Sequence, residues 1–103
     1  MTFKLILNPT FLTRAMITVP TDAGPVEQSL NVRFKVLPDE AEALESTEFL
    51  RQAILHLDDI VDDGNDAIPY STELLEQVIA RPFARVGLVR AYYQALAGAK
   101  AGN

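Results

Sequence analysis

The sequence predicts an α+β fold in which an N-terminal three-stranded antiparallel β meander packs on three to four C-terminal helices. Apolar residues alternate with period two before Pro38 and recur at helical spacing after it. The chain has 103 residues, of which 49% are hydrophobic, and this is enough to bury the core of one domain. We expect a single domain over 1–103, with the meander over 1–37, helices over 38–98 and a frayed tail over 99–103.

Three runs in the first third of the chain have strand-like patterns. Residues 3–8 begin with alternating apolar side chains, and residues 15–20 include three consecutive β-branched residues. Residues 30–37 alternate most clearly, with a bulky apolar side chain at every second position. Turn-forming residues at 21–25 separate the second run from the third. We therefore expect a meander with one face exposed to water.

The spacing becomes helical after Pro38. Asp39 and Glu42 have the separation of a capping box, which predicts a short helical turn. A consistent apolar stripe then predicts a helix over about 47–58, with Ser46 and Thr47 as its capping residues. The stripe consists of Phe49, Leu50, Ala53, Ile54 and Leu57.

Residues 58–71 are the least helical part of the second half and predict a charged loop, with Ile60 and Val61 anchored inward. The loop was tested against the EF-hand pattern, which requires a glycine at its sixth position. With Gly64 at that position, the third ligand position is Val61 and the twelfth is Tyr70. Two ligand positions therefore fail, and we expect no metal site.

Two further helices complete the chain. Ser71 or Thr72 is expected to cap the first, and Pro82 suits the first turn of the second. Gly98 is a suitable residue to end that helix. The first helix has an apolar face of Leu74, Leu75, Val78 and Ile79. The second has a predicted stripe of Phe83, Val86, Val89 or Arg90, Tyr93 and Leu96.

The charges are strongly segregated along the chain. Residues 39–76 hold twelve acids and one base, whereas the remaining residues hold two acids and eight bases. One interpretation is that the acids lie on the solvated surface and are complemented by arginines within the monomer. The other is that acids and bases form a bipolar surface that selects a partner or drives head-to-tail self-association. The net charge of −5 argues against binding to nucleic acid or to anionic membranes.

The composition offers little for catalysis. The chain has no cysteine, so thiolate chemistry and cysteine metal sites are excluded, and its single histidine, His56, lacks evident triad partners. Glycines do not form a phosphate-binding loop, and no apolar run approaches the roughly 20 residues that span a bilayer. We therefore expect a soluble, cytoplasmic protein that is not an enzyme and uses no cofactor.

Several short segments, taken in order, carry a family resemblance. They are Met-Thr-Phe-Lys-Leu-Ile-Leu-Asn-Pro-Thr-Phe at 1–11, Arg-Phe-Lys at 33–35, Ser-Thr-Glu-Phe-Leu at 46–50, the acidic run at 58–64, Pro-Tyr-Ser-Thr-Glu-Leu-Leu at 69–75, and the Ala- and Tyr-rich segment at 91–100. Together they resemble the small tail assembly chaperones of long-tailed, non-contractile bacteriophages and prophages. Members often carry a tryptophan where this chain has Leu57.

The resemblance implies a non-catalytic role in virion morphogenesis. Such chaperones bind the tape measure protein and keep it soluble while tail tube protein polymerises around it in the cytoplasm of the bacterial host. They are then absent from the mature virion, and many also exist in a longer form made by ribosomal slippage. The alternatives are a minor structural tail or head–tail connector protein, and an acidic inhibitor that mimics nucleic acid.

A small chaperone of this kind needs an apolar groove rimmed by charge. Our candidates for the groove are Leu74, Leu75, Val78 and Ile79, and those for its rim are Arg85, Arg90, Tyr92 and Tyr93. The alternative for each leucine is the ordinary core. Because the two tyrosines are adjacent on a helix and point about 100° apart, we expect one in the core and the other on the surface.

Overall fold

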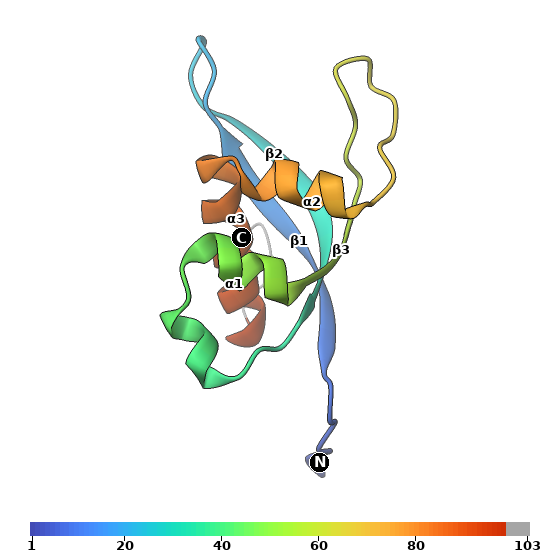
Figure 1. Ribbon diagram of the computed structural model, residues 1–103, viewed down its shortest axis with the longest axis vertical. Helices are drawn as coiled ribbons and strands as arrows, with labels where there is room; N and C mark the ends of the chain where they lie inside the picture. Colours follow the sequence, from blue (N-terminus) through green and yellow to red (C-terminus); the bar gives the residue numbers. More distant parts are fainter. Residues whose placement is uncertain (99–103) are drawn as a thin grey trace.

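The computed structural model describes residues 1–98 and has a three-stranded antiparallel sheet with helices packed on one face (Figure 1). The strands are β1 (Thr10–Val19), β2 (Val26–Lys35) and β3 (Ile54–Asp58), in the order β1-β2-β3. The helices are the 3-10 turn η1 (Asp39–Ala43), α1 (Ser46–Ala53), α2 (Thr72–Ile79) and α3 (Pro82–Leu96). The predicted α+β class is confirmed, while the predicted tail at 99–103 lies outside the described residues.

β1 and β2 form a long hairpin whose register runs from Thr10 opposite Lys35 to Val19 opposite Val26. The turn formers at 21–25 connect them as predicted, and Gly24 adopts a φ of +109°, which favours glycine. Side chains alternate between a buried inner face and an exposed outer face along both strands. The expectation of one wet face is therefore confirmed.

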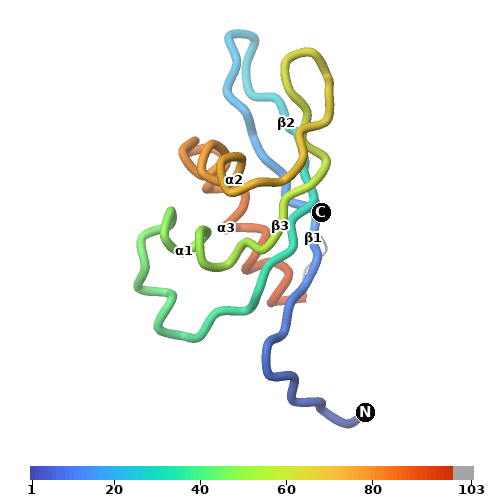
Figure 2. Tube along the Cα trace, turned by 45° about the vertical axis from the view of Figure 1, so that its right-hand side comes forward, coloured from blue at the N-terminus to red at the C-terminus, as the bar shows by residue number. Residues whose placement is uncertain are grey.

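The predicted first strand, over residues 3–8, is wrong. This segment extends away from the body of the protein as an arm (Figure 2), and the last backbone bond between β1 and β2 runs from the Val36 N–H to the Pro9 carbonyl. Because β1 begins at Thr10, only Asn8 and Pro9 separate the apolar residues of this segment from the strand. Proline does not suit the positive-φ turns that close such short hairpins, and among the described residues the segment is not paired with a strand.

The predicted helix over 47–58 is correct only in its first part. It ends at Ala53, and the next five residues form β3, which supplies the third strand of the sheet. All five residues of the predicted apolar stripe are nevertheless buried. The burial was therefore predicted correctly and the local conformation of residues 54–58 was not.

A β-bulge explains why this strand resembled a helix in the sequence. Ile54 and Leu57 are three residues apart, which in a regular strand would place them on opposite faces. The register between β2 and β3 shifts between Arg33 and Phe34, which leaves Leu55 as an extra residue in β3. Because of this extra residue, Ile54 and Leu57 both face the core.

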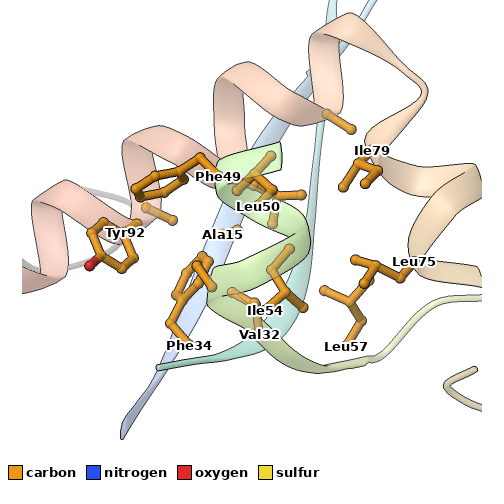
Figure 3. Packing of buried hydrophobic residues seen from close by; sticks show 14 of the residues in the cluster. Ala15, Val32, Phe34, Phe49, Leu50, Ile54, Leu57, Leu75, Ile79 and Tyr92 are labelled. Carbon is orange, nitrogen blue, oxygen red and sulfur yellow. The ribbon is translucent and has the colours of Figure 1, made fainter. Parts of the chain in front are cut away.

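The core lies between the inner face of the sheet and the helices (Figure 3). Its largest fully buried side chains are Phe34, Leu50, Leu57, Ile79, Leu88 and Val32. Tyr92 lies among them, with its ring edge-to-face with that of Phe49 at 4.9 Å and its hydroxyl accepting a bond from the Leu37 N–H. Tyr93 is 40% exposed, so the prediction of one core and one surface tyrosine is confirmed.

The stripe predicted for the last helix faces the core only in part, through Phe83 and Val89, which are partly buried and pack against it. The buried side of α3 is instead formed by Ala84, Gly87, Leu88, Ala91 and Tyr92. Val86, Tyr93 and Leu96 are exposed. The reason is the close approach of α3 to β1, since a Cβ atom on Gly87 would lie only 2.5 Å from the Met16 carbonyl oxygen. The small residues Ala84, Gly87 and Ala91 permit this close contact, while Leu88 and Tyr92 on the same side enter the core.

The predicted caps of η1 and α1 are wrong. Asp39 and Ser46 are the first residues inside these helices, so neither is a cap. Pro38 and Glu45 precede them without a side-chain cap.

The ends of α2 and α3 follow the predicted signals. The Ser71 hydroxyl accepts a bond from the Leu74 N–H at 3.1 Å, which makes Ser71 the cap of α2, and Pro82 opens α3. Gly98 follows α3 with a φ of +81°. No helix in the described part of the chain is long and apolar enough to cross a membrane.

Candidate partner-binding groove

A groove of about 580 Å³ lies at the end of the molecule that carries the β1–β2 turn. It is bounded by the inner face of the hairpin, the loop over 59–68, the end of α2 and the start of α3. Its floor and walls are largely apolar and include Ile17, Val19, Leu30, Leu74, Val78 and Phe83. Its rim includes Asp59, Asp63, Gln77 and Arg81.

The loop over 59–68 holds its shape through its own hydrogen bonds. The Ile68 N–H donates to the Ile60 carbonyl at 2.9 Å, so the two arms of the loop run together. At the tip, the Asp62 carboxylate accepts bonds from the backbone N–H groups of Gly64 and Asp66, at 2.8 and 3.0 Å. The loop thus forms a defined wall of the groove.

The two residues predicted to anchor this loop behave differently. Ile60 packs against the core as predicted, whereas Val61 is 51% exposed on the groove, so the prediction for Val61 is wrong. The cause is the bridge between Val61 and Ala67, which sets the backbone of Val61 outside the body of the sheet.

Two of the predicted groove residues do line the groove. Leu74 is buried in its floor, and Val78 is partly buried in its wall. Leu75 and Ile79 lie on the side of α2 that faces the core, which was the stated alternative for them. Their burial leaves them no surface for a partner.

The predicted rim residues are not brought together. Arg85 donates from Nη1 to the Ile79 carbonyl at 2.7 Å, and Arg81 donates to the Gln77 carbonyl, so both arginines satisfy the C-terminal end of α2. Arg90 is exposed beside a separate small hollow that Thr18 also lines.

The predicted tyrosines also lie away from the groove. Tyr92 is in the core, and Tyr93 stacks on Phe49 with ring centroids 5.9 Å apart. Of the eight residues predicted to bind a partner, only Leu74 and Val78 therefore belong to this groove.

The strands also contribute to this groove, which the sequence pattern did not predict. Ile17, Val19 and Leu30 occupy inward positions of the hairpin, and alternation alone assigned them to the core. Phe83 packs partly against the core, as expected, and also lines the groove at the junction of α2 and α3. No local pattern distinguished these positions from the core, because the part of a hairpin that the helices cover is set by tertiary packing.

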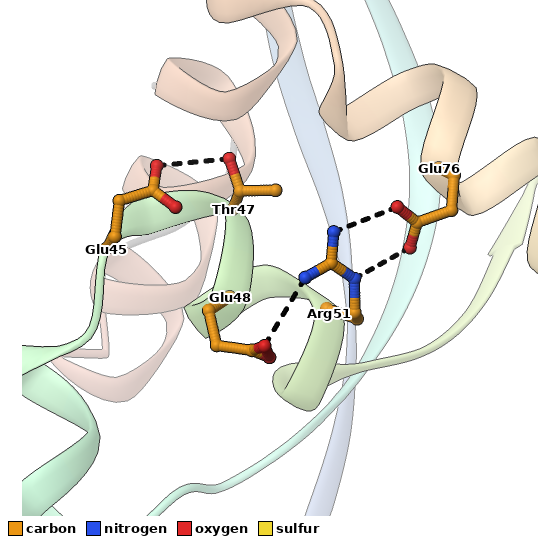
Figure 4. Close-up of polar contacts among 5 residues, drawn as sticks. All are labelled: Glu45, Thr47, Glu48, Arg51 and Glu76. Carbon is orange, nitrogen blue, oxygen red and sulfur yellow. Dashed lines mark hydrogen bonds and ion pairs between the residues drawn. The ribbon is translucent and has the colours of Figure 1, made fainter.

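Arg51 fixes the position of α2, which forms one wall of the groove (Figure 4). Its guanidinium binds both carboxylate oxygens of Glu76 at 2.8 and 2.9 Å, and it also contacts Glu48 at 3.3 Å. The hydrogen bond from Arg51 lowers the pKa of Glu76, and the same contact raises the pKa of the guanidinium. This bidentate ion pair joins α1 to α2 across the surface.

The acids at the start of α1 also have local partners. Glu45 precedes the helix, and its carboxylate accepts a bond from the Thr47 hydroxyl at 3.1 Å (Figure 4). The backbone N–H of Thr47 lowers the pKa of Glu45, with further contributions from the hydroxyls of Thr47 and Ser46. Some of the acidic side chains of 39–76 therefore have hydrogen-bond or ion-pair partners within the monomer.

The groove can bind an apolar surface on its floor and walls, and the charged and amide side chains of its rim can bind polar groups beside that surface. His56 lies elsewhere, exposed on β3 with its ring 5.0 Å from that of Tyr70. Within residues 1–98 no three His, Asp or Glu side chains are grouped so as to hold a metal ion.

Comparison with known proteins gave no match to a family model, to a curated protein or to a solved structure.

Proposed function

We propose that the protein is a non-catalytic tail assembly chaperone that binds the tape measure protein of a phage or prophage, and meets tail tube protein during assembly. The observation that carries the proposal is the apolar groove, together with the order of motifs that resembles this family. A long client helix exposes apolar stripes, and helix-in-groove binding covers such stripes.

The chemistry of the groove suits this client. The side chains of Val19, Val78 and Phe83 line it and can pack against an apolar stripe of a helix. Asp63 and Gln77 at the rim remain available to polar groups beside the client's apolar stripe. Rim charges of this kind select the partner and its orientation more than they add affinity.

Co-expression with the tape measure protein encoded beside this chain tests the proposal. We expect the wild-type protein to raise the soluble yield of the client and to be recovered with it in pull-downs. The double variant Val61→Lys/Gln77→Lys alters two exposed groove residues and should abolish both effects. Val86→Lys, at an exposed valine outside the groove, serves as the matched control. A client that stays insoluble beside the wild-type protein, with empty pull-downs, contradicts the proposal.

A minor structural tail protein is the second candidate, and the exposed N-terminal arm favours it. Segments that project from a subunit commonly join it to neighbours. Mass spectrometry of purified particles separates the two roles, because a chaperone is absent from the mature virion and a structural subunit is present in fixed stoichiometry. We expect the protein to be absent.

A further inference from the structure

The N-terminal arm, defined as residues 1–9, is rich in apolar side chains that are exposed to solvent. Phe3, Leu5 and Leu7 are 83%, 79% and 87% exposed, and Ile6 is 57% exposed. The arm extends along the long axis of the molecule, away from the helices (Figure 2). Contiguous exposed apolar side chains of this kind mark an interaction site.

We propose that the arm of one copy docks in the groove of a second copy of this chain. The arm projects from the end of the molecule where β1 begins, and the groove lies at the end where the β1–β2 turn is found (Figure 1). Leu7 lies three residues before Thr10 and so reaches at most about 10 Å from the start of β1, whereas Ile17, the first β1 residue that lines the groove, lies about 23 Å along the strand. The three apolar side chains of the arm therefore cannot enter the groove of their own copy together.

The spacing of the arm fits such a site. Phe3, Leu5 and Leu7 fall on one side of an extended chain and span about 13 Å at roughly 3.3 Å per residue. Three bulky side chains at this spacing can enter one apolar groove together, and the groove volume of about 580 Å³ accommodates a short apolar segment. The apolar walls at Val19 and Val78 supply the complementary surface.

The charges of the arm and the groove are also complementary. The arm carries Lys4 and no acidic residue, whereas the loop over 58–66 carries five aspartates. Asp59 and Asp63 lie at the rim of the groove, and Asp59 pairs with Arg14 at 2.9 Å. The opposing rim cation, Arg81, is engaged by the Gln77 carbonyl. Lys4 lies on the opposite side of an extended arm from Phe3 and Leu5, so in a docked arm it points away from the groove floor, and its long side chain can reach the acidic rim at Asp63.

The contact is heterologous, because it joins different surfaces of the two copies. A pair formed in this way retains one free arm and one free groove, so association continues beyond the dimer. Docking requires no client and therefore does not rest on the proposed function. Where both occur, the arm and the client compete for the same groove.

Sedimentation of the purified full chain over a range of concentrations tests the docking. We expect the wild-type mass to rise above the monomer mass of 11.3 kDa and to pass that of a dimer. The arm variant Phe3→Ser/Leu5→Ser/Leu7→Ser and the groove variant Val61→Lys/Gln77→Lys should each weaken self-association at least tenfold. Leu12→Ser and Val86→Lys, at exposed apolar residues outside both surfaces, should associate as the wild type does.

Mixing the two defective variants gives the sharpest result. The groove variant supplies an intact arm and the arm variant supplies an intact groove, so together they should form a 1:1 heterodimer and nothing larger. Circular dichroism and thermal melting of each variant establish that it is folded.

Four outcomes overturn the proposal. They are a wild-type protein that is monomeric at all concentrations, a wild-type protein that stops at a closed dimer, a groove variant that associates normally, and a mixture that yields no heterodimer.

Discussion

The inner face of the hairpin is covered at one end and open at the other. From the start of β1 to its middle, the inner face is covered by the helices, and Phe34 and Ala15 are fully buried there. Near the β1–β2 turn, the same alternation continues through Val19, but no helix covers the sheet there, and the inner face becomes the wall of the groove. One period-two pattern thus produces both core and binding surface, and the placement of the helices decides which part becomes which.

The covered end depends most on Leu88, which is fully buried in the centre of α3. Leu88→Ala removes apolar contacts and leaves a cavity, and we expect it to lower the free energy of unfolding by about 2–5 kcal/mol. Denaturant unfolding measures this loss. Val86→Ala on the exposed side of the same helix should cost less than about 0.5 kcal/mol. Equal losses at the two sites would contradict the assigned orientation of α3.

The close approach of α3 to β1 predicts the next largest effect. In Gly87→Ala the added methyl group meets a backbone oxygen of Met16, which a side-chain rotation cannot relieve. We expect a loss of about 1–3 kcal/mol, despite the higher helix propensity of alanine. The melting temperatures of Gly87→Ala and of the control Arg90→Ala, at an exposed residue of the same helix, check the prediction. A stabilised Gly87→Ala protein would show that α3 lies farther from the sheet.

The cap of α2 predicts a smaller change at the open end. Ser71→Ala removes the acceptor for the Leu74 N–H and should cost about 1 kcal/mol. The sequence left Ser71 and Thr72 as alternatives, so Thr72→Ala is the matched control and should change the unfolding free energy little. A larger effect at Thr72 than at Ser71 would contradict the observed cap.

The smallest effect concerns the ion pair between α1 and α2. Since Arg51 lowers the pKa of Glu76, the pair contributes stability above the unfolded pKa of glutamate, and this is lost as the pH falls through the lower folded pKa. Melting temperatures of wild type and Arg51→Met should differ slightly at pH 7 in low salt and converge progressively as the pH falls below the ordinary glutamate pKa of 4.5. Arg33→Met, at an exposed arginine outside this pair, should show no such convergence. A difference that persists in acid would contradict this assignment.

The sequence identified the buried side chains better than their conformations. Ile54 and Leu57 were correctly predicted to be buried, but a bulge made their strand look helical in the one-dimensional pattern. The N-terminal run was read as a strand because alternation alone does not show whether a partner strand exists. In α3, the determinant was the backbone clearance at Gly87, which apolar periodicity ignores.

The candidate site was less predictable than the fold. Leu74 and Val78 were identified from the apolar face of one helix, whereas Val19 and Val61 reach the groove from segments that only the tertiary structure brings together. Arg85 was assigned to a rim by its charge and in fact caps the end of α2. Local patterns therefore found residues of the groove without finding its boundaries.

Methyl NMR of the full chain during titration with a soluble segment of the tape measure protein tests the central claim most directly. The account predicts that the methyl resonances of Val19, Val61 and Val78 shift or broaden at stoichiometric client, while that of Val86 is unchanged. Perturbation centred on Val86, or no perturbation in the groove despite binding, would contradict the assignment of the groove as the client site.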